Sequence, residues 1–286
     1  MADGRWRERS HELPSAICHL PSNGGRLNLK KLTAAVVLLV AIAGCHRGPR
    51  LIKPVVDPQL LQMTSEQVWA AAEEFYARHK WQRARTYYTY LFENHPNDVL
   101  GRRSLLRVAD TYYEQGDPVN LVEAQYKYRD FINRYPTSDQ ADYAMLRIAM
   151  CSFKQMERPD RDQQKTKEAL EKFNDVIRTY PNSQLHAEAE ARRQDVLDRL
   201  AKHEHLVARF YMKRGSWNAA VQRLNFLIDT YANYKDRDGV FFDLGTSLAA
   251  LGRTGEARLY FERVLSEFPK SDYADRARRR LGDTKA

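Results

Sequence analysis

The stretch that decides the fold is residues 201–231, AKHEHLVARFYMKRGSWNAAVQRLNFLIDTY. Its first half predicts a helix with one apolar face made by Leu206, Val207, Phe210 and Tyr211. Gly215 follows, where a turn can use the backbone freedom of glycine. The second half predicts another helix with apolar residues at steps of three and four: Trp217, Ala220, Val221, Leu224, Leu227, Ile228 and Tyr231. Two such helices cannot bury their stripes alone, so the stretch predicts neighbours of the same kind.

The same pattern of two apolar stripes recurs on both sides of this stretch. Four of the units end in a proline, which cannot continue a helix, at Pro96, Pro136, Pro181 and Pro269. The unit at 201–231 ends in Tyr231-Ala232 without one. Paired helices repeated along a chain are typical of tetratricopeptide (TPR) arrays. The sequence therefore predicts an all-α TPR-like solenoid of about five helix pairs over residues 63–286.

A targeting segment precedes the repeats. Lys30-Lys31 stand before a short apolar run that ends in Ile-Ala-Gly-Cys45, the layout of a secretory signal. This ending resembles the lipobox of bacterial lipoproteins, which implies cleavage before Cys45 and lipid on its thiol. The alternative is a plain signal peptide with an incidental cysteine. We expect an extension and signal peptide over 1–44 and a proline-containing lipidated tether over 45–62.

Composition restricts the function classes. The 286-residue chain is 43% hydrophobic and 29% charged, which suits a folded domain. Its net charge of +9 is compatible with nucleic acid, an anionic membrane or simple solubility, but no aromatic-basic motif accompanies it, so we expect no nucleic-acid binding. Cys151 lies in an apolar helical context and reads as a small core residue.

The motifs of catalysis are missing. His203 and His205 are two residues apart, and a zinc-binding helix places its histidines four apart. There is no glycine-rich phosphate loop and no GxSxG elbow. We therefore expect no metal, no cofactor apart from the covalent lipid on Cys45, and no enzymatic activity.

Two segments carry a family resemblance: RDQQKTKEALEKFNDVIRTYPNSQ from residue 161 and LDRLAKHEHLVARFYMKRGSWNAAVQRL from residue 197. They resemble the BamD family, lipoprotein subunits of the outer-membrane β-barrel assembly (Bam) complex. The resemblance implies a non-catalytic scaffold, lipid-anchored on the periplasmic face of the outer membrane. Its implied partners are a POTRA domain of a BamA-like barrel protein, the other Bam lipoproteins and unfolded outer membrane proteins.

The resemblance also implies binding residues. Arg223 aligns with a family arginine at the BamA contact, and it should point outward because Leu224 beside it faces inward. The alternative is an ordinary solvated arginine. The first repeats are rich in aromatic residues, of which Tyr76 and Tyr113 are the candidates to hold the aromatic end of a β-barrel substrate. The alternative for both is a place in the core.

Two other classes compete with this interpretation. One is a TPR lipoprotein of the Tol–Pal and peptidoglycan envelope-coordination class; such proteins often carry a coiled coil before their repeats, and no heptad run is present here. The other is an envelope enzyme with a helical accessory domain, for which the repeats leave no room.

Overall fold

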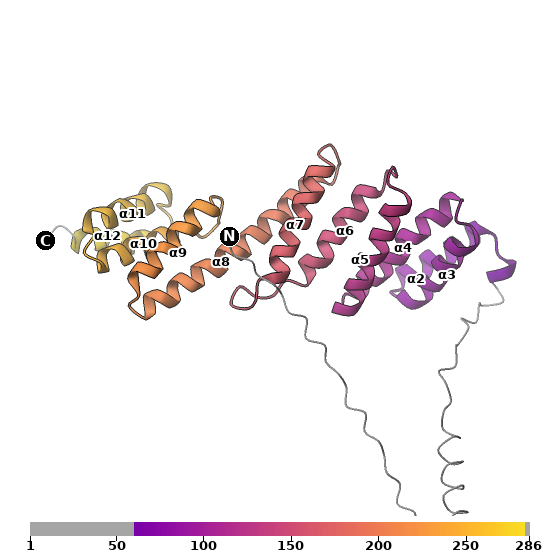
Figure 1. Cartoon of the computed structure of the whole chain (residues 1–286), viewed down its shortest axis with the longest axis horizontal. Helices are drawn as coiled ribbons and strands as arrows, with labels where there is room; N and C mark the ends of the chain where they lie inside the picture. The colour runs from indigo at the N-terminus through magenta and orange to yellow at the C-terminus, as the bar shows by residue number, and fades with distance from the viewer. Residues whose placement is uncertain (1–59, 284–286) are drawn as a thin grey trace, which may run out of the picture. The chain divides into compact units, whose positions relative to one another are not determined.

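The computed structural model describes residues 60–283, which form helices and turns without strands. A short 3₁₀ helix, η1 (Leu60–Gln62), precedes eleven α-helices that follow one another along the described part of the chain (Figure 1). Their bounds are α2 (Ser65–Ala77), α3 (Trp81–Asn94), α4 (Val99–Gln115), α5 (Pro118–Arg134), α6 (Ala141–Lys154), α7 (Gln164–Thr179), α8 (His186–Lys213), α9 (Trp217–Thr230), α10 (Arg237–Ala250), α11 (Thr254–Glu267) and α12 (Ala274–Asp283).

The helices pack in chain order, each against the next. Pairs α2–α3, α4–α5, α6–α7, α8–α9 and α10–α11 are the five predicted repeats, and α12 covers the last of them. First helices also touch across pairs, α2 with α4 and α8 with α10. The predicted all-α, TPR-like solenoid of five helix pairs is confirmed.

The helix ends follow the chemistry of their residues. The side chain of Thr64 accepts a hydrogen bond from the Gln67 amide while the Gln67 side chain binds the Thr64 amide, so α2 begins with a capping box. At the other ends, α3, α5, α7 and α11 stop two residues before Pro96, Pro136, Pro181 and Pro269. The prolines therefore end the helices where the sequence predicts.

Small residues bring the helices close together. Ala72 and Ala84 are fully buried between the first pair, and Ala109 and Ala124 between the second. Large side chains fill the space around them, among them Tyr88, Tyr128, Phe131, Phe173, Phe241 and Phe261. Each buried cluster draws residues from neighbouring pairs, so the core runs along the repeats and has no single centre.

The turns inside the second, fourth and fifth pairs share one backbone conformation. Gly116, Gly215 and Gly252 have φ of 75°, 71° and 75°, in the left-handed region that glycine adopts without a Cβ clash. The third pair differs, because nine residues (155–163) connect α6 to α7. The predicted role of Gly215 in the turn of residues 201–231 is confirmed.

The predicted apolar face of α8 is wrong in part. Leu206 is 36% exposed and Phe210 is 51% exposed. The buried residues in this half of α8 are the small Ala201 and Ala208 together with His205, because α9 and α10 approach that side closely. Spacing alone indicated an apolar stripe, but the neighbouring helices cover a different side.

Gly245 provides a test of this close packing. A Cβ at this position in α10 would lie 2.8 Å from Cε1 of Phe261 on α11. Gly245→Ala should therefore lower the free energy of unfolding by about 1–3 kcal/mol through overpacking, measured by urea denaturation. The matched control is Gly255→Ala in α11, where nothing lies within 4 Å of the new Cβ. It should leave stability unchanged or raise it by up to about 1 kcal/mol; equal effects of the two substitutions would contradict the packing argument.

Candidate functional site

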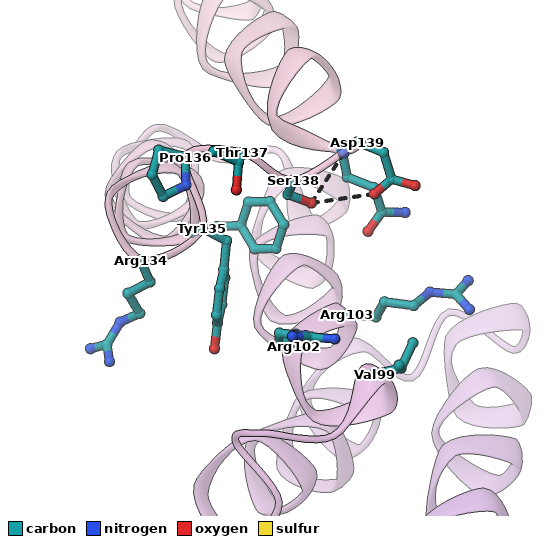
Figure 2. Close-up of a pocket in the computed structure, with 11 residues that line it drawn as sticks. Val99, Arg102, Arg103, Arg134, Tyr135, Pro136, Thr137, Ser138 and Asp139 are labelled. Carbon is teal, nitrogen blue, oxygen red and sulfur yellow. Dashed lines mark hydrogen bonds between the residues drawn. The ribbon is translucent and has the colours of Figure 1, made fainter.

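A groove runs over the first three helix pairs along α4. It consists of two cavities that share Arg103 and Gln140, and we call it the α4 groove. The first cavity, of about 600 Å³, is lined by the start of α4, the end of α5 and the loop before α6: Val99, Arg102, Arg103, Phe131, Arg134, Tyr135, Pro136, Thr137, Ser138, Asp139 and Gln140 (Figure 2). The second, of about 360 Å³, is lined by Trp69, Glu73, Arg103, Leu106, Arg107, Asp110, Gln140 and Tyr143.

Two local features place the start of α4. Asp98 caps the helix, its side chain accepting a 2.7 Å hydrogen bond from the Val99 amide. One turn on, Gly101 lies so close to the end of the preceding helix that any Cβ would collide with the carbonyl oxygen of His95. The absence of a side chain there lets α4 approach, and this fixes where Arg102 and Arg103 leave the helix.

The first cavity is cationic. Three guanidinium groups line it, against one carboxylate, Asp139, which accepts a hydrogen bond from Ser138. Arg134 is paired with Asp130 at 2.8 Å. Figure 2 shows Arg102 and Arg103 leaving α4 opposite the loop that carries Ser138 and Asp139.

The two α4 arginines differ in their surroundings. The Arg103 guanidinium lies 5.0 Å from the centre of the Trp69 ring. The Arg102 guanidinium makes no hydrogen bond or ion pair with any residue in the described range 60–283. An arginine whose charge is not compensated within the fold is available to bind an anionic group.

The floor of the second cavity is a polar cluster that we call the Asp110 hub: Glu73, Arg107, Asp110, Tyr128 and Tyr143. Asp110 and Tyr128 are buried, and the other three are half-buried. Arg107 makes two hydrogen bonds to Glu73, of 2.6 and 2.9 Å, and a third of 3.2 Å to Asp110. Asp110 also accepts hydrogen bonds from the hydroxyls of Tyr128 at 2.6 Å and Tyr143 at 2.9 Å. The Asp110 carboxylate, which is 4% exposed, thus connects α4 to α5 and α6, and Arg107 connects this group to Glu73 on α2.

Electrostatics keeps these groups in complementary charge states. Burial raises the pKa of the Glu73 carboxyl, but hydrogen bonds from Arg107 and Tyr88 outweigh it and hold that pKa below its ordinary value. Burial, and next to it the Asp110 carboxylate, raise the pKa of both Tyr128 and Tyr143. Glu73 is therefore charged and the two phenols remain hydrogen-bond donors at neutral pH.

The two tyrosines selected from the sequence lie beside the groove. Tyr76 is half-buried, with the Arg107 guanidinium 4.0 Å above its ring and Trp81 at its edge, and it lines neither cavity. Tyr113 is 4% exposed, and Lys154 and Arg147 cover its ring at 3.6 and 4.6 Å. A ligand could reach Tyr113 only if these two side chains moved, so the structure puts it in the core, which the sequence left as its alternative.

The aromatic residues that do line the groove are Trp69, Phe131, Tyr135 and Tyr143. Sequence reasoning missed them together with Arg102 and Arg103. A usable signal was present on α4, where Arg103, Arg107 and Asp110 recur at steps of four and three and so lie along one side of the helix. The apolar stripe predicts which side of α4 packs against other helices, and this polar stripe predicts which side lines the groove.

Arg223 lies on α9, far along the chain from this groove. Its side chain is 46% exposed, as expected, but it is already paired: Nη1 lies 3.1 Å from a carboxylate oxygen of Glu204 on α8. Phe226, one turn further along α9, is 46% exposed as well. A role for Arg223 in binding a partner stays a prediction.

The remaining candidates are placed as follows. His203 Nδ1 lies 2.7 Å from the carbonyl oxygen of Pro159, while His205 is buried with Nε2 2.9 Å from Asp243, so the two imidazoles have different partners. Over residues 60–283 no three or more metal-ligating side chains gather. Cys151 is buried, and burial raises the pKa of its thiol to about 12.

Residues 1–59, including Cys45 and the predicted signal and most of the tether, lie outside the described residues. Within the described part, none of the helices combines the length and the apolar character needed to cross a bilayer.

Comparison with known proteins places this architecture in a family. The chain is 28% identical over 225 residues to the outer membrane protein assembly factor BamD of Caulobacter vibrioides, covering 79% of this chain and 72% of the relative. It is 27% identical over 260 residues to BamD of Neisseria meningitidis serogroup A, covering 87% of this chain and 95% of the relative. The model of the YfiO outer membrane lipoprotein family matches residues 61–258. Because this match covers more than half of the chain, the protein belongs to the YfiO family of outer membrane lipoproteins.

Proposed function

We propose that this protein is a non-catalytic assembly factor for outer membrane β-barrel proteins, acting on the periplasmic face of the outer membrane. The observation that carries the proposal is family membership, together with relatives named as outer membrane protein assembly factors that align over 72% and 95% of their length. The helical repeats support it, because stacked helix pairs present extended surfaces for other polypeptides.

The α4 groove is the proposed site for an unfolded barrel segment. Arg102 and Arg103 supply guanidinium groups that can hold a carboxylate, and Trp69 and Tyr143 in the adjoining cavity supply ring surface for an aromatic side chain. A carboxylate beside an aromatic side chain is what a polypeptide ending in phenylalanine or tryptophan presents. In this proposal the α4 groove holds the aromatic end of the substrate, which the sequence analysis assigned to Tyr76 and Tyr113.

A peptide-binding measurement tests the groove. The probe is a labelled peptide that copies the last twelve residues of a barrel protein and ends in phenylalanine. Replacing Arg102 and Arg103 together by glutamine should weaken its binding about 3- to 30-fold, since two partly exposed ionic contacts are lost. Arg258→Gln is the matched control, because Arg258 is an exposed arginine of α11 paired with Glu262. Equal affinities for the wild type and the double variant would exclude these arginines from the site.

The outward side of α8 and α9 is the proposed docking surface for a POTRA domain of a BamA-like barrel protein. Arg223 is exposed and is positioned by Glu204, and the neighbouring Phe226 offers an exposed aromatic ring. An arginine next to an aromatic residue is a common composition of interface centres. A partner carboxylate would share or replace the contact with Glu204. Other lipoproteins of the Bam complex would complete the assembly.

Co-purification from solubilised envelopes tests this assignment and the proposed function together. Tagged wild-type protein should recover a POTRA-containing barrel protein. Arg223→Glu should reduce that recovery at least about fivefold, because it reverses the charge facing the partner and repels Glu204. Arg258→Glu controls for a charge change on another helix, and unaltered thermal unfolding shows that the fold is intact. A wild-type complex without any POTRA protein would overturn the proposed function; unchanged recovery with Arg223→Glu would overturn only the docking site.

Anchoring through lipid on Cys45 is the proposed means of membrane attachment. The support is the Ile-Ala-Gly-Cys sequence after an apolar run and the membership of an outer membrane lipoprotein family. Cells given labelled palmitate should incorporate it into the wild-type protein, and Cys45→Ser should abolish the label because no thiol remains at that position. Cys151→Ser is the control, since that thiol is buried in the core. Label that persists in Cys45→Ser would contradict the assignment.

A further inference from the structure

The turn of the first helix pair has the same shape as those of the second, fourth and fifth pairs but lacks their glycine. Gly116, Gly215 and Gly252 have φ near +70°, whereas the corresponding residue between α2 and α3 is His79, with φ of 57°. A left-handed backbone conformation is unfavourable for a residue that carries a Cβ, and histidine gains nothing from it as glycine does. Left-handed residues other than glycine cluster at functional sites, which directs attention to the surroundings of His79.

The His79 side chain makes few contacts that could stabilise the fold. Its imidazole is exposed and makes no hydrogen bond to any described residue; its ring lies 4.9 Å from that of Trp81, edge to face. Trp81 in turn meets Tyr76 at 4.8 Å. His203 and His205, by comparison, are both held by polar contacts within the fold. The imidazole of His79 is therefore presented to the surface at the end of a row of three aromatic rings.

A separate cavity of about 450 Å³ lies at this turn. We call it the His79 pocket; it is lined by His79, Lys80, Trp81, Gln82, Arg83 and Gln115. It shares no residue with the α4 groove. No carboxylate lines it, although Lys80 and Arg83 both do.

The two cations of the pocket are not neutralised within residues 60–283. Neither Lys80 nor Arg83 makes an ion pair there, and the Arg83 guanidinium lies 5.7 Å over the ring of Phe75. By contrast, Arg78 is paired with Glu74 in the turn before, and the corresponding turn of the last pair has Arg253 paired with Glu256. Uncompensated positive charge in a concave site is complementary to an anionic group.

We propose that the His79 pocket binds an aspartate or glutamate side chain from an acidic, extended segment of a partner polypeptide. Lys80 and Arg83 supply the charge, the His79 imidazole supplies an N–H donor, and Trp81 supplies a flat wall for the adjacent residue of the segment. The cavity is open to the surface, so a side chain projecting from an extended segment can enter it. The site does not depend on the α4 groove or on Arg223.

The first test uses a defined probe and the full chain in detergent micelles. The probe is a fluorescein-labelled twelve-residue peptide with aspartate at alternate positions and one central tyrosine. Its uncharged counterpart has asparagine in place of every aspartate. The aspartate peptide should bind at least about tenfold more tightly, with an affinity that falls as salt rises. Equal binding of the two peptides, or binding of neither, would overturn the proposal.

Variants then locate the binding. Lys80→Gln with Arg83→Gln should weaken the aspartate peptide about fivefold. The matched control is Lys213→Gln with Arg214→Gln, which removes the same charge from the α8–α9 turn, where the residue at the left-handed position is Gly215. Equal losses in the two double variants would show that only net charge matters and would overturn the pocket.

His79→Gly separates function from folding. It should raise the melting temperature by about 2 °C, because the turn gains the residue that its geometry favours, and at the same time weaken the peptide about threefold. Gly252→His, the reverse change at a turn with open space around the residue, should lower the melting temperature and leave binding unaltered.

A more stable His79→Gly protein with full affinity would overturn the role of His79. Binding of vesicles containing phosphatidylglycerol through the same three residues, without peptide binding, would assign the site to a membrane surface instead.

Discussion

None of the helices within residues 60–283 can bury its own apolar stripe, and the fold of this part of the chain follows from that constraint. Each helix must be covered by the helices before and after it, so contacts are made between neighbours and the core extends from pair to pair. Close approach depends on small residues at the crossing points, such as Ala109 and Ala124. Stability in such an array is close to a sum over pairs and their interfaces. The surfaces between and beyond the stripes are then free to differ from one pair to another.

In addition to their apolar contacts, the first three pairs are joined by a polar cluster, the Asp110 hub. The Asp110 hub places a carboxylate that is 4% exposed among one guanidinium and two phenols. A buried charge is tolerable only when it is paired, so every partner constrains the helix that carries it. The hub therefore sets the spacing of α2, α4 and α6 more tightly than apolar contacts would. The α4 groove is lined by these helices, so the contacts of the hub also hold the walls of the groove in place.

Periodicity was sufficient to predict the class of fold, the number of pairs and the helix ends. Pro96, Pro136, Pro181 and Pro269 end helices because of their own chemistry, which needs no knowledge of the neighbours. The side of a helix that becomes buried is different, because it depends on where the next helix lies. The sequence spacing places Leu206 and Phe210 on one apolar stripe, but they are 36% and 51% exposed in the fold.

The groove was harder to predict for a related reason. Its lining comes from α2, α4, the end of α5, the loop of residues 135–140 and the start of α6, which are brought together only by the stacking of pairs. Arg102 and Arg103 are two among 46 lysines and arginines. Nothing in the local sequence marks Arg102, and Arg103 is marked only by its place on the polar side of α4 with Arg107 and Asp110. Family resemblance directed attention to Arg223 and to the first repeats, but it could not say that Tyr113 would be covered by Lys154 and Arg147.

The longest helix gives the molecule a further property. Over its 28 residues, α8 contributes Ala189, Val196 and Leu200 to the cluster of the third pair, and Ala201 and Ala208 to that of the last two pairs. One continuous helix thus joins the third pair, whose α6 contributes Tyr143 to the groove, to the fourth pair, whose α9 carries Arg223. A single residue inserted near position 200 would rotate everything after it by about 100° and advance it by about 1.5 Å. Helical register in α8 therefore determines the angle at which two partners bound at opposite ends would face each other.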